Sequence, residues 1–165
     1  MPINRLASAL PFCLSLVFLP VIAAGAAWGG WWLFLTPVYS FALMTLMDAV
    51  NALNTANPDT DTPESDLIWY RMITVIWFPL QAILIFGTLW WVTHSNHLQL
   101  WEALILFYAI GIATGGVGIV YAHELFHKQA PERHLGDLLL ALVLYSHFRT
   151  EHLLVHHAWV GTPRD

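Results

Sequence analysis

Long runs of apolar residues separated by short polar breaks dominate this chain. Four runs approach or exceed the roughly 20 residues that an α-helix needs to cross a bilayer, and they cover residues 6–28, 31–50, 69–93 and 100–122. The breaks at 29–30 and 94–97 are short enough for tight turns, whereas residues 51–68 are polar and acidic and predict a surface loop. Because backbone groups inside lipid need partners within the protein, the pattern predicts an all-α, polytopic membrane bundle, organised as one membrane domain over residues 1–165.

The stretch after the fourth run is expected to return to the end of the bundle that it has just left. The fourth helix is predicted to continue beyond its apolar run until Pro131 stops it. Residues 135–148 are apolar but too few to cross a bilayer, so they predict a short interfacial or partly inserted helix. The two halves of region 123–165 are therefore expected to meet at one end of the bundle, as a shared site requires.

The composition excludes several classes of protein. Of the 165 residues, 58% are hydrophobic and 10% are charged, against roughly 25% charged in typical globular domains, and the mean hydropathy is +0.60. A net charge of −5 without a basic patch argues against a nucleic-acid partner. The single cysteine, Cys13, excludes an internal disulfide. Membrane lipid is therefore the expected surrounding of this chain.

The basic residues predict the orientation of the helices. With four alternating spans, all six lie on the side of the N-terminus: Arg5, Arg71, Lys128, Arg133, Arg149 and Arg164. The positive-inside rule makes that side cytoplasmic, which indicates an integral protein of a bacterial inner membrane. Small residues at 23–27 also allow a cleaved signal peptide, and cleavage would leave this orientation unchanged.

Two groups of histidines follow the fourth run. The first has the pattern H-E-x-x-H at His123 and His127, and the second has H-x-x-x-H-H at His152, His156 and His157. Residues four positions apart share a helix face, so the pairs 123/127 and 152/156 can each hold an ion from one side. His157 then lies about a quarter turn away, towards a second ion or another edge of the site. Because neutral imidazole is a common ligand for iron, zinc and copper, a metal centre at the membrane surface is predicted.

Several kinds of site are compatible with these histidines. H-E-x-x-H is also the motif of zinc metalloproteases, in which the intervening glutamate, here Glu124, is the general base. Five histidines exceed the three protein ligands of a catalytic zinc site, so the second group would have no role in a protease. A heme would need histidines within the spans, and simple solvated histidines are an interpretation that suits His94 and His97 in the opposite loop. A non-heme di-iron site uses all five imidazoles, because two irons need many nitrogen donors.

The two motifs and their surroundings resemble a known family. The run from Tyr145 to Asp165, with H-x-x-x-H-H followed by V-x-T-P-x-D, is similar to the membrane alkane 1-monooxygenases. That group includes xylene monooxygenases and lies within the membrane fatty-acid desaturase and hydroxylase superfamily. Desaturases typically have H-x-x-H-H in the second box, so the spacing favours the alkane branch, with a membrane fatty-acid desaturase or hydroxylase as the alternative. The resemblance covers about residues 37–165.

The resemblance implies an activity, cofactors and partners. Such enzymes hydroxylate a terminal alkane or an alkyl side chain with O2 at two non-heme iron ions, using electrons from rubredoxin or a ferredoxin-type donor with its reductase. By position, the implied iron ligands are His123, His127, His152, His156 and His157. The family has a third histidine box further along, and none follows here. Residues 1–165 are therefore expected to be the N-terminal part of a longer protein and to be inactive alone.

Residues near the boxes have two interpretations each. Glu124, Glu151 and His147 are candidates for hydrogen bonding to ligand imidazoles, and the two glutamates are equally explained as interfacial carboxylates that balance nearby basic residues. His134 is best explained as a solvated side chain. The fourth span also carries a set of glycines that predicts either close helix packing or room for a hydrocarbon chain: Gly111, Gly115, Gly116 and Gly118.

Overall fold

Helices make up most of the described chain. The computed structural model describes residues 9–51 and 61–164, and no strand occurs within these ranges. Four helical segments are long and apolar enough to cross a membrane: Leu10–Trp28, Gly30–Val50, Ile68–Ser95 and Leu100–Phe126. They confirm the predicted all-α membrane bundle, and their bounds lie within a few residues of the predicted ones. Residues 6–8 of the first predicted span and 52–60 of the predicted loop lie outside the described residues.

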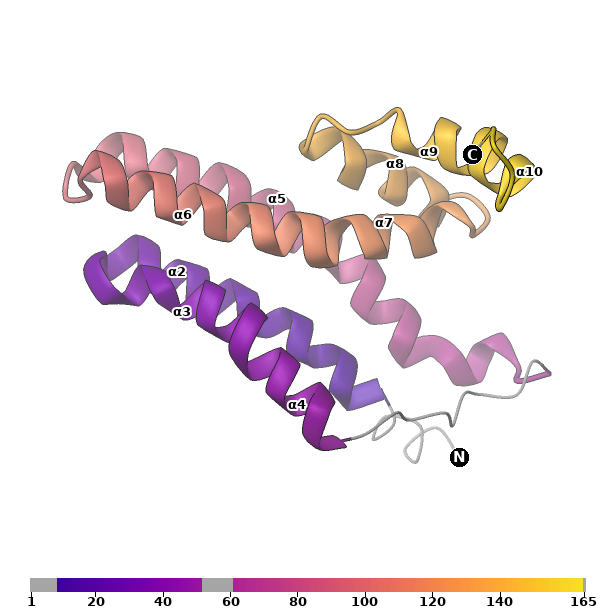
Figure 1. Ribbon diagram of the computed structural model, residues 1–165, viewed down its shortest axis with the longest axis horizontal. Helices are drawn as coiled ribbons and strands as arrows, with labels where there is room; N and C mark the ends of the chain where they lie inside the picture. The colour runs from indigo at the N-terminus through magenta and orange to yellow at the C-terminus, as the bar shows by residue number, and fades with distance from the viewer. Residues whose placement is uncertain (1–8, 52–60, 165) are drawn as a thin grey trace.

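The four spans form two helical hairpins. The first hairpin consists of η1 (Leu10–Val17), α2 (Phe18–Trp28), η2 (Gly30–Phe34), α3 (Leu35–Pro37), η3 (Val38–Leu43) and α4 (Met44–Asn51). The second hairpin, with the short helix before it, consists of η4 (Glu64–Leu67), α5 (Ile68–Ser95), α6 (Leu100–Ala113), η5 (Thr114–Gly118) and α7 (Ile119–Phe126). In these spans η3 and η5 are π-helical, and the other η elements are 3-10 helices. Figure 1 shows the hairpins side by side with both turns at the same end.

The core between the hairpins contains a buried amide. Trp77 has no exposed surface and Gln81 is 1% exposed. The Nε1–H group of Trp77 donates to Gln81 Oε1 at 2.8 Å, which pairs polar atoms that would otherwise be costly to bury. Gly118 lies directly against the Gln81 side chain. A Cβ added at any of the other three glycines of this span would meet no atom of another helix within 4 Å: Gly111, Gly115 and Gly116. Close helix packing therefore accounts for Gly118 alone of the four.

A buried carboxylate joins the two hairpins at the end where both turn. Glu102 is 9% exposed and accepts hydrogen bonds from the backbone N–H groups of Gly30, at 2.7 Å, and Gln99, at 2.8 Å. The bond from Gln99 also caps the start of α6. Gly29 has a φ of +61°, and a Cβ there would lie 2.9 Å from Glu102 Oε1, so the turn requires glycine. The first hairpin is thus fixed to the second through backbone donors.

Beyond α7 the chain reverses and runs back along the bundle. The helix α8 (Glu132–Leu142) packs against α7, as Figure 1 shows. Gly136 makes this contact possible, because a Cβ there would lie only 2.8 Å from the carbonyl oxygen of Ala122. Leu139 and Leu140, each 1% exposed, bury the apolar face of α8 against the bundle. The return therefore depends on one very close backbone approach and two buried leucines.

Two predicted boundaries in this region were wrong. The fourth helix ends before it reaches Pro131, which instead precedes α8. The short helix predicted over 135–148 ends at Leu142, and a turn with Leu144 at a φ of +58° separates it from α9 (Phe148–Glu151). Hydropathy alone does not distinguish a helix from a turn built of apolar residues, so the turn within this apolar run was not predicted.

The four spans place residues 96 and 130 at opposite ends of the bundle. Reporter fusions after these two residues should therefore give opposite signals, with the fusion after residue 130 on the cytoplasmic side, as the basic residues predict. Paired alkaline phosphatase and green fluorescent protein fusions measure this, and a fusion after residue 165 should match the one after residue 130. Identical signals after residues 96 and 130 would contradict the four-span arrangement.

The contact at Gly136 generates a second prediction. We expect Gly136→Ala to lower the free energy of unfolding by about 1–3 kcal/mol, because the added Cβ forces α8 away from the α7 backbone. Thermal unfolding of the detergent-solubilised protein measures the effect. Gly115→Ala is the matched control, since a Cβ there meets no atom within 4 Å. Equal losses of thermal stability in both variants would show that the loss of glycine itself, and not the contact, is responsible.

Candidate metal centre

The first histidine box lies at the end of α7. His123 is within the helix, and His127 is the residue that caps its C-terminus. The four-residue spacing puts both rings on one helix face, with their centroids 4.7 Å apart. The first box therefore has the geometry expected from its sequence.

The second box lies on a π-helical turn, which changes the pairing of its histidines. The segment η6 (His152–His156) is π-helical and continues into α10 (His157–Trp159). A π-helix is wound more widely than an α-helix, with i to i+5 hydrogen bonds, so a residue five positions along lies closer to the face of residue i than it would in an α-helix. His157 Nε2 lies 2.8 Å from His152 Nε2. The ring nitrogens of His152 and His157 are thus in contact, in addition to the stacked pair 152/156 that α-helical spacing predicted to share a face.

The two boxes meet and form a cluster of four imidazoles. His123 Nε2 lies 2.9 Å from His152 Nε2, although the two residues are 29 positions apart in the sequence. One ligand nitrogen from each of four histidines falls within 4.8 Å of the others: His123, His127, His152 and His157. Two nitrogens bound on opposite sides of one ion are about 4.2 Å apart. Small side-chain rotations would therefore bring all four donors to a single ion.

Two of the clustered imidazoles have pKa values shifted towards the neutral form that binds metal. The pKa values of His127 and His152 are lowered from the ordinary value, first because partial burial disfavours the charged imidazolium. The neighbouring rings of His123 and His157 lower both pKa values further, because positive charges so close together repel. At neutral pH these two rings are uncharged and present a free lone pair. The donor set and its protonation both fit a transition-metal ion.

His156 is the predicted ligand that the cluster leaves out. Its exposed ring stacks on His152, with 5.3 Å between centroids, and it is not one of the four clustered donors. Together with Glu151 and Tyr145 it lines a separate hollow beside the cluster. His156 therefore adjoins the four-imidazole cluster on a different side of the same helix.

The three residues that were candidates for hydrogen bonding to the ligand imidazoles lie in different places. Glu124 Oε1 is 3.5 Å from His123 Nδ1, on the ring nitrogen that faces away from the cluster. Glu151 is exposed and lines the hollow with His156. His147 is exposed at the start of α9, outside the cluster. Of the three, Glu124 is the one beside a clustered imidazole.

Two aromatic rings cover one side of the cluster and were not singled out from the sequence. The centroids of Phe126 and Phe148 lie 5.7 and 5.3 Å from that of His152, and Phe126 is 3% exposed. Apolar rings here exclude water from this side of the imidazoles. Phe126 belongs to the first box itself, so its position in the motif was the sequence signal from which it could have been predicted.

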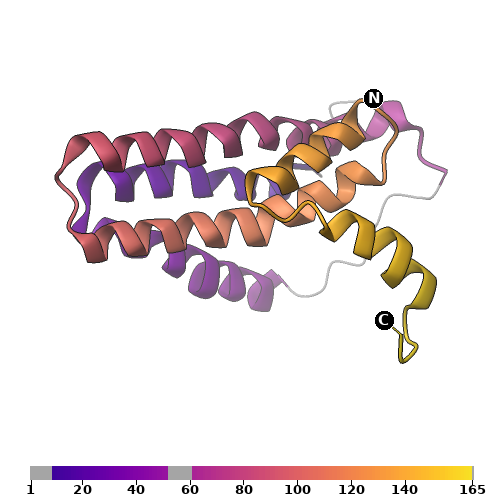
Figure 2. The same cartoon turned by 90° about the horizontal axis from the view of Figure 1, so that it is seen from above.

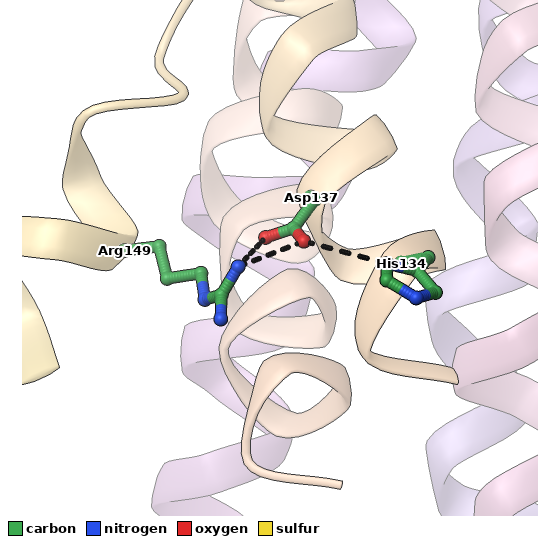
Figure 3. Close-up of polar contacts among 3 residues, drawn as sticks. All are labelled: His134, Asp137 and Arg149. Carbon is green, nitrogen blue, oxygen red and sulfur yellow. Dashed lines mark hydrogen bonds and ion pairs between the residues drawn. The ribbon is translucent and has the colours of Figure 1, made fainter. Parts of the chain in front are cut away.

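An ion pair between α8 and α9 was also missed. Arg149 Nη1 donates to both carboxylate oxygens of Asp137, at 3.0 and 2.9 Å (Figure 3). Asp137 is the single acidic residue in the apolar stretch 135–148. A lone charge in such a stretch is a sequence signal for a specific partner.

Comparison with known proteins agrees with the histidine boxes. Residues 99–165 match the model of the fatty acid desaturase family. The chain is 35% identical to alkane 1-monooxygenase 1 of Pseudomonas aeruginosa, an alignment that covers 94% of this chain and 42% of that protein. It is 33% identical to alkane 1-monooxygenase 2 of the same organism, over 81% of this chain and 36% of that protein. Alkane 1-monooxygenase 1 of Alcanivorax borkumensis is 32% identical over 82% of this chain and 34% of its own length.

The chain thus spans between a third and a half of the length of these relatives. The matched family model covers the fourth span and both histidine boxes. The resemblance inferred from the boxes is confirmed: this chain is related by sequence to the membrane alkane monooxygenases of the desaturase and hydroxylase superfamily.

Proposed function

We propose that this protein takes part in the O2-dependent hydroxylation of a hydrocarbon, a terminal alkane or an alkyl side chain, at a non-heme di-iron centre. The observation that carries the proposal is the gathering of four imidazoles from two distant boxes within 4.8 Å of one another. The similarity to alkane 1-monooxygenases supports the same reaction. In this proposal the four clustered histidines hold one iron, and His156 serves the second.

Bound iron would supply the activation of dioxygen, and the chain's own residues prepare the place where it occurs. His127 and His152 are held neutral, so they present lone pairs without first losing a proton. Glu124 lies beside Nδ1 of His123, where a carboxylate fixes the orientation of the ring. Phe126 keeps water from one side of the cluster. Together these residues orient the donors and exclude a competing ligand.

The proposed location rests on the predicted orientation of the spans, and the proposed partners rest on the resemblance to the alkane monooxygenases. The chain acts as a single membrane domain of the bacterial inner membrane, with both boxes on the cytoplasmic side. Hydrocarbon then arrives from the lipid, and electrons come from rubredoxin or a ferredoxin-type donor with its reductase in the cytosol. Five imidazoles fill fewer than the roughly ten to twelve positions of two five- or six-coordinate ions. Iron held by these five imidazoles alone is therefore expected to be bound weakly.

Two other activities remain candidates to test. A membrane fatty-acid desaturase or hydroxylase is favoured by the family model that matches residues 99–165. A zinc metalloprotease would use His123, Glu124 and His127. The geometry disfavours the protease, because four clustered imidazoles would close the coordination position that a catalytic zinc ion keeps for water.

The pairing on the π-helical turn leads to a metal-binding prediction. We expect His157→Ala to weaken iron binding by at least about tenfold, and more than His156→Ala does, because His157 is in the cluster and His156 is not. Anaerobic iron titration followed by elemental analysis measures this. His94→Ala is the control, since its ring stacks on Trp90 at the far end of the bundle. A larger loss in His156→Ala than in His157→Ala would contradict the four-imidazole assignment.

The reaction itself separates the three candidate activities. Cells that express this protein together with rubredoxin and its reductase should convert a medium-chain alkane to the 1-alcohol, and His152→Ala should abolish the product, because it removes the imidazole at the centre of the cluster. Gas chromatography with mass spectrometry identifies the product. A new double bond in a fatty acyl chain would favour the desaturase. Zinc-dependent peptide cleavage that requires Glu124 and tolerates His157→Ala would favour the protease.

A further inference from the structure

The segment that carries the second box has no buried residue to hold it in place. None of the residues of α9, η6 or α10 is buried, and Phe148 and Leu153 pack against the core while remaining partly exposed. Figure 2 shows this segment, in yellow, projecting from the side of the bundle. Yet His152 and His157 need a fixed position relative to the first box if four nitrogens are to hold one ion. Because the packing of Phe148 and Leu153 is only partial, a further contact is needed to fix that position.

The ion pair between Asp137 and Arg149 lies at the place where such a contact is needed. Arg149 precedes His152 by one helical turn and extends across to α8, where Nη1 contacts both oxygens of Asp137 (Figure 3). His134 Nδ1 lies 3.9 Å from the same carboxylate and is exposed, so it does not displace Arg149. A charged hydrogen bond to both oxygens restricts the direction from which the arginine approaches.

Asp137 is itself fixed relative to the first box. Its neighbour Gly136 makes the closest approach of α8 to α7, against the backbone of Ala122 and Phe126. These two residues directly precede His123 and His127 in the sequence. The contacts therefore run without a break from the first box, through α8 and the ion pair, to the second box.

We propose that Asp137 is a positioning residue of the metal centre. By holding Arg149, it keeps the helix of the second box in register with the first box, so that His152 and His157 face His123 and His127. The inference rests on the proposed metal centre and extends it to a residue outside the histidine motifs. Asp137 is 12 residues from Arg149 and belongs to a different helix, so it acts on the ligands through the arginine and does not touch the ion.

The partial exposure of the Asp137–Arg149 ion pair limits how strongly its loss can affect the protein. Both side chains are 34% exposed, and ion pairs at such positions contribute little to overall stability. The position of a weakly anchored helix is more sensitive, because a small difference in free energy selects among its orientations. We expect loss of the pair to weaken metal binding by about tenfold, the lower end of the range for residues that orient metal ligands.

Metal titration of the full chain in detergent tests this, with Co2+ as the probe because its absorption reports the ligand set. Asp137→Asn should weaken Co2+ binding about tenfold and alter the spectrum of the bound ion. The exchanged pair Asp137→Arg with Arg149→Asp should restore both. Glu132→Gln is the matched control, because it removes the carboxylate that contacts Arg71 at the N-terminal end of α8 and should change neither. Unchanged binding in Asp137→Asn, or an equal loss in Glu132→Gln, overturns the proposal.

A second measurement needs no metal. Spin labels on cysteines placed at Val120 and Leu154, in a Cys13→Ala background, report the distance between α7 and the helix of the second box. Asp137→Asn should broaden the distance distribution, and the exchanged pair should narrow it again; equal widths in all three proteins overturn the proposal. If the unmodified chain binds no Co2+, the proposed metal centre fails, whereas the distance distribution still decides the role of Asp137.

Discussion

The close approach of α8 to α7 is the contact on which the candidate site depends. The first box lies at the end of a membrane span. The second box follows it closely in the sequence, so the chain has to reverse direction in the segment between the two boxes. Gly136 allows the reversal because a side chain there would collide with the carbonyl oxygen of Ala122. Leu139 and Leu140 stabilise it by burying apolar surface that the bundle otherwise leaves exposed. The geometry of the candidate metal site is therefore a consequence of helix packing between residues that are not themselves candidate metal ligands.

The backbone of the second box decides which histidines act together. The spacing H-x-x-x-H-H contains pairs four and five residues apart, and a regular α-helix would bring the first pair to one face. On the π-helical turn the rings of both His156 and His157 lie beside His152, and it is Nε2 of His157 that approaches Nε2 of His152 to 2.8 Å. Single π-turns are rare and occur often at functional sites.

The sequence predicted the bundle better than it predicted the site. Apolar runs long enough to cross lipid fix the four spans, since inside a bilayer helix is the structure that pairs every backbone group. The π-helical turn could not be read from spacing, because the choice between i+4 and i+5 bonding depends on contacts with α7. Glu102 and the pair Asp137–Arg149 were missed for a related reason: each joins segments whose proximity follows from tertiary packing. The histidine motifs identified the candidate nitrogen donors, and tertiary packing of the helices determined which of these imidazoles lie close together.

The two sides of the cluster differ in a way that suits the proposed reaction. Phe126 and Phe148 pack against His152, and Phe126 also lies beside His127, whereas His127 and His157 keep exposed surface. A hydrocarbon has no hydrogen bonds to offer, so it is better accommodated against apolar rings than against water. A soluble electron donor needs the opposite, an exposed approach to the ligands. In the proposed function, one asymmetric cluster at the end of a membrane bundle therefore gives an apolar substrate and a water-soluble protein separate routes to the same site.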